Sequence, residues 1–306
     1  MELTKKSKNY LKPLVYLKLW TPYKKVVNNL FRRELSLNNP EPDNKTKTLE
    51  REIKLARNIQ MKLLNGNNPK IENGQISGIS IPARLIGGDY YDFYLLSNGK
   101  LRIVIGDVMG KGIPAAMLMI LTRGAFRSAA ESTKGPGETL TAMNNAMYED
   151  LRTLGSFVTV LCADWDPCQR TLTYASAGHN LPLVVKSIHE VFEAPKIKGV
   201  MLGGLPSTSY EENSIKIEEE ELVFFYTDGI TEALNQDGEM FRIDRLEETL
   251  KKNYGLDVKE MEESITNSID KFTENVPQKD DITMVLLKVN HDQTNITSYN
   301  SPVINP

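Results

Sequence analysis

The sequence predicts an α+β protein, a four-layer α-β-β-α sandwich in which two mostly antiparallel sheets pack face to face between helix pairs. Of its 306 residues, 40% are hydrophobic and 25% are charged, the balance of a globular protein with a packed core. Short apolar or alternating runs typical of strands come in two clusters, and each cluster is followed by two longer runs with helical periodicity. A last apolar run returns the chain to one of the sheets. This order favours two stacked sheets with helices outside them.

An amphipathic helix expected at residues 48–64 leads into the strands. Leu49 and Ile53 begin a series of apolar residues at helical spacing, Thr48 is a suitable N-cap, and the sequence NGNNP ends the helix. The preceding residues 35–47 are polar and rich in Asn and Pro, so we expect a linker there.

Turn signals divide the rest of the chain. The Asn98-Gly99 pair predicts a hairpin turn, and Gly135-Pro136-Gly137 predicts a break between two helices. The expected strands are 75–82, 90–96, 101–107, 157–165, 171–177, 181–186, 188–193, 214–218, 221–227 and 282–289. The expected helices are 113–131, 137–152, about 242–252 and 257–275, and a polar tail is expected at 291–306.

Charge is distributed unevenly along the chain. Residues 1–33 contain nine Lys and Arg against one acid, a net charge of +8, so the remainder sums to −11 within the total of −3. Apolar residues between these lysines predict one or two amphipathic helices, broken near Pro13 and Pro22. The favoured interpretation is a helical cap packed on the body or on a second copy. The alternative is peripheral contact with an anionic membrane or a partner protein.

Composition also excludes several classes of protein. An acidic body argues against nucleic-acid binding, which needs a basic surface to neutralise phosphates. Only Cys162 and Cys168 are present, too few for a disulfide framework. No apolar run is long enough to span a membrane and residues 1–20 do not resemble a secretion signal, so we expect a cytoplasmic protein.

Four acidic positions stand out because each lies where a buried strand begins or ends. Asp89 follows two glycines in LIGGDYYDF, and Asp107 ends the apolar run of LRIVIGDVMGKG. Asp228 ends the run in ELVFFYTDGITEA, and the pair Asp280-Asp281 opens DDITMVLLKV. Taken singly, Asp89 can also be a turn residue and Asp107 a helix cap.

Acids at strand edges can converge if their strands belong to neighbouring or facing sheets. Clustered carboxylates repel one another, and bound cations remove that repulsion. Oxygen ligands without Cys and with little His favour Mg²⁺ or Mn²⁺ over zinc. Two such ions sharing a carboxylate are suited to the hydrolysis of a phosphate ester.

The motifs GGDYYDF, IGDVMGKGIPAAM, SAGHNLPL, YTDGITEA and DDITMV, in this order, resemble the metal-dependent PPM-type serine/threonine protein phosphatases, in particular their bacterial SpoIIE-like branch. The resemblance spans about residues 49–289. It implies a domain at 66–290, preceded by an extension and linker at 1–47 and a linker or switch helix at 48–65, with two Mn²⁺ or Mg²⁺ ions between the sheets.

The resemblance also implies the roles of individual residues. Asp107 is expected to bridge both ions, and the carbonyl of Val108 to be a further ligand. Asp228 and Asp280 are expected to hold one ion, and Asp89 to lie on the other side of the centre. Asp280 is preferred as the ligand because the family's terminal motif carries the metal on its first residue, and Asp281 is then a candidate supporting residue.

The resemblance implies direct attack of metal-bound water on phosphorus, without a phosphoenzyme. The sequence agrees with this mechanism, because neither cysteine lies in a Gly-rich anion loop that would support a thiolate nucleophile. Arg84, five residues before Asp89, has the spacing at which members of this family can place a phosphate-binding arginine, and a surface charge is the alternative. His179 is interpreted as a structural residue, with general acid as the alternative.

The expected activity is phosphoserine or phosphothreonine hydrolysis in a signalling protein such as a STAS-domain anti-anti-sigma factor, by an enzyme that we expect to be a homodimer. The alternatives are a non-catalytic scaffold with the same fold and a phosphatase for small phosphate esters. The complete set of carboxylates disfavours the scaffold, and no nucleotide-binding motif supports the small substrate.

Overall fold

The computed structural model describes residues 42–64, 68–274 and 276–290. Residues 1–51 and 52–306 form separate units, and the fold below is that of the described part of the second. The basic head at 1–33 and the polar tail at 291–306, both predicted above, lie outside the described residues.

Helix α2 (Pro42–Leu64) contains the helix expected at 48–64 but begins earlier. Its first residues belong to the segment predicted as linker. Proline is well accommodated in the first turn of a helix, where its missing N–H has no partner to lose. In the second unit, Gln60 and Leu64 are the buried residues of this helix.

The first sheet, sheet B, begins with the hairpin predicted at Asn98-Gly99, which joins its first two strands. All of its neighbouring strands are antiparallel, and each pairs with the next along the chain until β8 joins the edge. In spatial order the strands are β2 (Tyr90–Leu95), β3 (Leu101–Val108), β4 (Val158–Asp166), β5 (Thr171–Ala177) and β8 (Asn213–Lys216).

The second sheet, sheet A, joins strands from both ends of the described chain. Its neighbours are also antiparallel, and the last strand lies between the first strand and β9. In spatial order the strands are β1 (Gly74–Ile81), β10 (Ile282–Val289), β9 (Leu222–Tyr226), β6 (Leu183–Val185) and β7 (Val191–Glu193).

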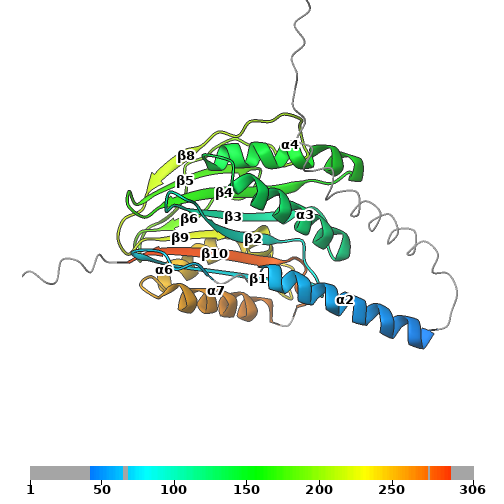
Figure 1. The fold of residues 1–306 in the computed structure, drawn as a ribbon. Helices are drawn as coiled ribbons and strands as arrows, with labels where there is room; N and C mark the ends of the chain where they lie inside the picture. The colour runs from blue at the N-terminus through cyan, green and yellow to red at the C-terminus, as the bar shows by residue number, and fades with distance from the viewer. Residues whose placement is uncertain (1–41, 65–67, 275, 291–306) are drawn as a thin grey trace, which may run out of the picture. The chain divides into compact units, whose positions relative to one another are not determined.

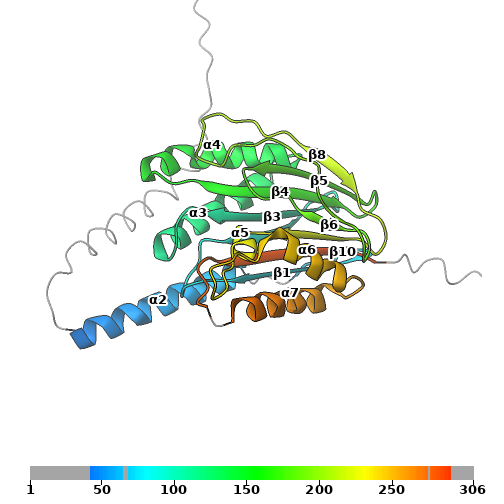
Figure 2. The same cartoon turned by 180° about the vertical axis from the view of Figure 1, so that it is seen from behind.

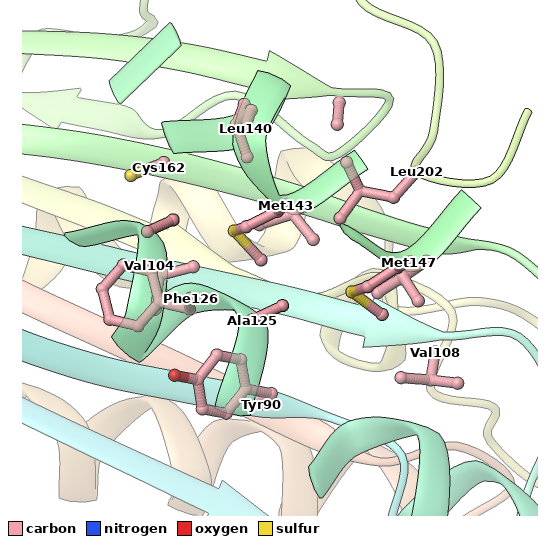
Figure 3. Packing of buried hydrophobic residues seen from close by; sticks show 14 of the residues in the cluster. Tyr90, Val104, Val108, Ala125, Phe126, Leu140, Met143, Met147, Cys162 and Leu202 are labelled. Atoms are coloured by element: carbon pink, nitrogen blue, oxygen red, sulfur yellow. The ribbon is translucent and has the colours of Figure 1, made fainter. Parts of the chain in front are cut away.

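Helix pairs cover the outer faces of the two sheets (Figures 1 and 2). Helices α3 (Ile113–Ala130) and α4 (Pro136–Leu154) pack on sheet B, where Phe126 and Met143 enter the core seen in Figure 3. Helices α6 (Arg242–Lys252) and α7 (Val258–Thr273) pack on sheet A. A third core lies between the sheets. The four-layer α-β-β-α architecture predicted from the sequence is therefore confirmed.

Strand alternation decides which layer each side chain enters. On β3, Val104 and Val108 face α3 and α4, whereas Ile103 and Ile105 face the other sheet. Because successive side chains point to opposite faces, Asp107 is on the side that faces sheet A.

Two local differences from the expected elements have simple causes. Strand β7 begins at Val191 rather than 188, because a tight turn closes with a hydrogen bond from Glu190 N to Ser187 O at 3.3 Å. A short helix, α5 (Asp228–Thr231), follows β9. Among the described helices, none has the length and hydropathy needed to cross a bilayer.

Candidate metal centre

The pairing of β2 with β3 brings Asp89 and Asp107 together. The last paired residues of this ladder are Tyr90 and Gly106, so the next step along both strands carries the two acids. Asp89 is only 2% exposed and accepts a hydrogen bond of 2.8 Å from the Thr227 hydroxyl. Because Thr227 directly follows β9, this bond joins the two sheets at the acidic site.

The second pair of acids comes from sheet A, at adjoining ends of β9 and β10. Thr227 N donates to Thr283 O at 3.0 Å, and Thr283 N donates to the Thr227 hydroxyl at 3.0 Å. A Cβ atom at Gly229 would overlap the Asp281 carbonyl oxygen. Glycine is therefore required after Asp228, because the loop rests directly on the backbone of residues 280–281.

Asp281 supports the neighbouring loop through its carboxylate. Its Oδ1 accepts from Ala83 N at 2.7 Å, and its Oδ2 accepts from Gly88 N at 2.6 Å. A Cβ at Gly87 would lie 2.6 Å from the same Oδ2, and a Cβ at Gly88 would lie 3.2 Å from the Val108 carbonyl oxygen. The GGD sequence thus lets the Asp89 loop fit closely against both Asp281 and Val108.

Burial and mutual repulsion alter the ionisation of three of these acids. Burial raises the pKa of Asp89 well above its usual range, and the charge of Asp107 raises it further. The pKa of Asp107 is raised to about 7, first by burial and then by Asp228 and Asp280. Burial, followed by the charges of Glu232 and Asp280, raises the pKa of Asp228. The acids therefore act on one another electrostatically across the two sheets.

This donor set fits divalent cations by its chemistry. Carboxylates and a backbone carbonyl are hard oxygen ligands, and each carboxylate would be relieved of repulsion by a cation. Within residues 42–64, 68–274 and 276–290, however, no three His, Cys, Asp or Glu side chains form a group close enough to enclose a single ion. The structure thus assembles the acids at one end of the sheets without closing a coordination shell around one point.

One cation of the chain itself reaches this group of acids. Lys111, in the loop between β3 and α3, forms an ion pair with Asp280, with 2.7 Å between Nζ and Oδ2. The two residues are 169 positions apart. Sequence reasoning missed Lys111, and the only available signal was its position between two glycines of the IGDVMGKG motif.

Arg84 lies near the same loop. Its side chain is exposed, and its Nη1 atom is 3.6 Å from the point that a Cβ of Gly112 would occupy. The guanidinium is therefore beside the start of α3, with no ion-pair partner among the residues that the structure describes.

His179 contacts the strand next to Asp107 and is not in hydrogen-bond contact with any of the four acids among the described residues. It is 8% exposed, and its Nδ1 is 2.9 Å from the hydroxyl of Thr159, the residue opposite Asp107 in the β3–β4 register. Burial lowers its pKa to about 4, against an opposing contribution from the Tyr226 backbone, so the imidazole is neutral at neutral pH. These contacts favour the structural interpretation of His179.

Two stacked antiparallel sheets, outer helix pairs and acids gathered where the sheet ends meet define the architecture of a PPM-type protein phosphatase. A family model described as Stage II sporulation protein E (SpoIIE) matches residues 97–290. The chain belongs to this SpoIIE family. The resemblance and the enzyme class predicted from the motifs, a phosphoprotein phosphatase, are thereby confirmed.

Individual relatives agree with this assignment. The chain is 30% identical over 240 residues to "Phosphoserine phosphatase RsbU" of Bacillus subtilis. This aligned region covers 78% of the chain and 70% of RsbU. It is 30% identical over 261 residues to "Protein IcfG" of Synechocystis sp., covering 76% of the chain but only 41% of IcfG. The chain thus spans less than half the length of this second relative.

Solved structures show the same fold. The SiaA-PP2C domain of Pseudomonas aeruginosa superposes with a TM-score of 0.68 at 22% identity, covering 81% of this chain and 99% of that domain. The PP2C phosphatase domain of SpoIIE from Bacillus subtilis, solved with a fragment of its regulatory domain, gives a TM-score of 0.56 at 18% identity, covering 72% of this chain and 63% of that chain.

Proposed function

We propose that the protein is a divalent-metal-dependent phosphatase that hydrolyses phosphoserine or phosphothreonine in a signalling protein, with a STAS-domain anti-anti-sigma factor as the candidate substrate. The observation that carries the proposal is the meeting of Asp89, Asp107, Asp228 and Asp280 from two sheets in a member of the SpoIIE family. The description of RsbU as a phosphoserine phosphatase supports the substrate class.

Each residue has a defined part in this proposal. Asp107 would contribute to the binding of two Mn²⁺ or Mg²⁺ ions, and the Val108 carbonyl would add a ligand. Asp228 and Asp280 would hold one ion, and Asp89 would lie on the other side of the centre. When bound, the ions supply a nucleophile at neutral pH and neutralise charge on the phosphoryl group.

Arg84 is the proposed phosphate-binding group. Its exposed guanidinium lies beside Gly112 at the edge of the acidic site, and no ion pair with a described residue holds it elsewhere. A planar guanidinium can donate to two phosphate oxygens at once, so it can orient the substrate as well as attract it.

The test is hydrolysis of a phosphoserine peptide in the presence of Mn²⁺. Asp107→Asn and Asp228→Asn are each expected to lower the rate by about 1,000-fold or more, because each removes a negatively charged ligand. Asp166→Asn is the matched control, since Asp166 is the last residue of β4, at the opposite end of this strand from the partner of Asp107, and pairs with Lys100 at 3.2 Å. It is expected to retain the wild-type rate.

Two results would contradict the proposal. Hydrolysis by the wild-type protein that persists in excess chelator would refute the dependence on divalent metal. A folded wild-type protein that hydrolyses neither peptide nor phosphoprotein with Mn²⁺ would instead support the non-catalytic scaffold. Incubation of the Asp228→Asn variant with phosphorylated proteins, followed by isolation of the complex, would identify the substrate.

A homodimer and a cytoplasmic location are part of the same proposal. Light scattering of the full chain measures its mass in solution. Co-sedimentation with anionic vesicles, with and without residues 1–47, tests the membrane alternative for the basic head. Equal binding by both proteins would exclude a role for the head as a membrane anchor.

A further inference from the structure

Lys111 is held in an unusual place by two glycines. Gly110 and Gly112 on either side of it have φ angles of 100° and 74°, a conformation that favours glycine. From this loop of sheet B, Nζ donates to Asp280 Oδ2 at 2.7 Å and also to the Lys279 carbonyl. Lys111 therefore links the loop after β3 of sheet B to the residues that precede β10 of sheet A.

The Asp280 carboxylate is fixed on its other side as well. Its Oδ1 accepts from Asp281 N at 3.0 Å, and the carbonyl of Asp280 accepts from Gln278 Nε2 at 2.7 Å. The backbone N–H of Asp281 therefore bonds to one carboxylate oxygen of Asp280, and Lys111 bonds to the other. Both partners of the ion pair are about one-third exposed, at 38% for Lys111 and 34% for Asp280, so solvent ions can reach the pair.

The ammonium also acts on Asp228. Its positive charge is close enough to interact favourably with the Asp228 carboxylate as well as with Asp280. Asp228 and Asp280 are the two acids assigned above to one metal ion. Among the described residues, no other Lys or Arg forms an ion pair with any of the four acids of the proposed centre.

We propose that Lys111 is the resident counter-ion of the metal centre, and that a divalent ion binds by displacing its ammonium from Asp280. The inference rests on the proposed function, because it takes Asp280 as a metal ligand. Without metal, the ammonium neutralises an acid that would otherwise add to the repulsion among Asp89, Asp107 and Asp228. With metal, the same ammonium is a like charge next to the ion and lowers the affinity of the site.

The decisive experiment is titration of the full chain with Mn²⁺ by calorimetry. Lys111→Gln removes the ammonium while retaining a polar side chain, and we expect Mn²⁺ to bind about 3- to 10-fold more tightly, the effect of losing one partly exposed ion pair that competes with the metal. Lys111→Arg preserves the charge and is expected to bind within about twofold of wild type.

Lys279→Gln is the matched control. Lys279 is the residue before Asp280, its side chain is exposed, and it offers only its backbone carbonyl to Lys111. The substitution changes the net charge by the same amount, so we expect binding within about twofold of wild type if the position of the charge matters.

A second measurement follows the ammonium itself. In protein labelled with ¹⁵N-lysine, the side-chain resonance that disappears in Lys111→Gln is expected to shift towards the value of a solvated lysine as diamagnetic Mg²⁺ is added. A resonance that stays unchanged while Mg²⁺ binds would overturn the proposal that the ion displaces Lys111 from Asp280.

The proposal is overturned if Lys111→Gln binds Mn²⁺ no more tightly than wild type, if Lys279→Gln gains as much, or if neither wild type nor Lys111→Gln binds. Suppose instead that the wild-type protein binds Mn²⁺ with displacement of Lys111 but hydrolyses no phosphopeptide or phosphoprotein. That result would refute the proposed function and leave the role of Lys111 standing.

Discussion

Sheet B carries acids on both of its faces, but among the described residues only the acids on one face form ion pairs with arginines. Asp92 and Asp164 are on the face covered by α3 and α4, where arginines meet them. Asp89 and Asp107 are on the side of sheet A, and no arginine among the described residues pairs with either. Since buried charge needs compensation, the first pair is satisfied within the fold, and the cation proposed above would compensate the second.

The acids facing the helices are paired closely. Arg102 is fully buried and donates through Nε and Nη2 to the two oxygens of Asp164, at 2.6 and 2.7 Å. Asp92 receives Arg127 in an ion pair and lies 3.4 Å from Nε of Arg123. Both arginines come from α3, so this pairing fastens the helix to β2.

The largest expected effect in this comparison comes from breaking the Arg102–Asp164 pair. Arg102→Met leaves the Asp164 carboxylate buried without its partner, so we expect the free energy of unfolding to fall by about 3–5 kcal/mol in urea titrations. The double variant Arg102→Met/Asp164→Leu is expected to recover most of that loss. A double variant as unstable as the single one would show that Arg102 stabilises the fold by other contacts.

A smaller effect is expected from His179, which contacts the strand next to Asp107. Its pKa is about 4 in the folded protein against 6.5 for the unperturbed group, so between these values the unfolded chain binds the proton and the folded chain does not. Stability is therefore lost as the pH falls from 6.5 towards 4. We expect His179 to account for about 2–3 kcal/mol of that loss.

His179→Asn isolates this contribution. Its amide can still bond to Thr159 but does not titrate, so unfolding measured in chelator from pH 7 to pH 4 should show a shallower decline than in wild type. Parallel declines for the two proteins would mean that other groups carry the acid sensitivity.

The smallest effect should have opposite signs for an acid of the proposed metal centre and for an acid that faces the helices. In chelator at neutral pH, Asp228→Asn is expected to raise the free energy of unfolding by about 1 kcal/mol, because it relieves repulsion from Asp280 and Glu232. Asp92→Asn is expected to lower it, because it weakens the contacts with the arginines of α3. Destabilisation by both substitutions would remove the distinction between paired and unpaired acids.

Much of this arrangement could be predicted from the sequence because it depends on local patterns. Asp107 and Asp228 end apolar strands and are followed closely by glycine, so their positions at strand ends were visible in the motifs. Helix α2 shows the limit, since propensity alone did not extend it back to Pro42.

The ion pairs could not be predicted in the same way. Arg102 and Asp164 are 62 residues apart, and Lys111 and Asp280 are 169 apart. Such partners are chosen by strand register and loop geometry rather than by sequence spacing. Arg102 and Asp164 lie inside the apolar strands LRIVIGDV and VTVLCADWD, but the sequence alone does not identify one as the partner of the other.

The place of β10 in sheet A has a consequence for the order in which the protein is made. The strand pairs with β1 from Gly74↔Val289 to Ile81↔Ile282, across roughly two hundred residues of intervening chain. A chain growing on the ribosome therefore exposes the unpaired edges of β1 and β9 until the last strand emerges. Because Asp280 arrives with that strand, the acids of the site come together only when the sheet itself is completed.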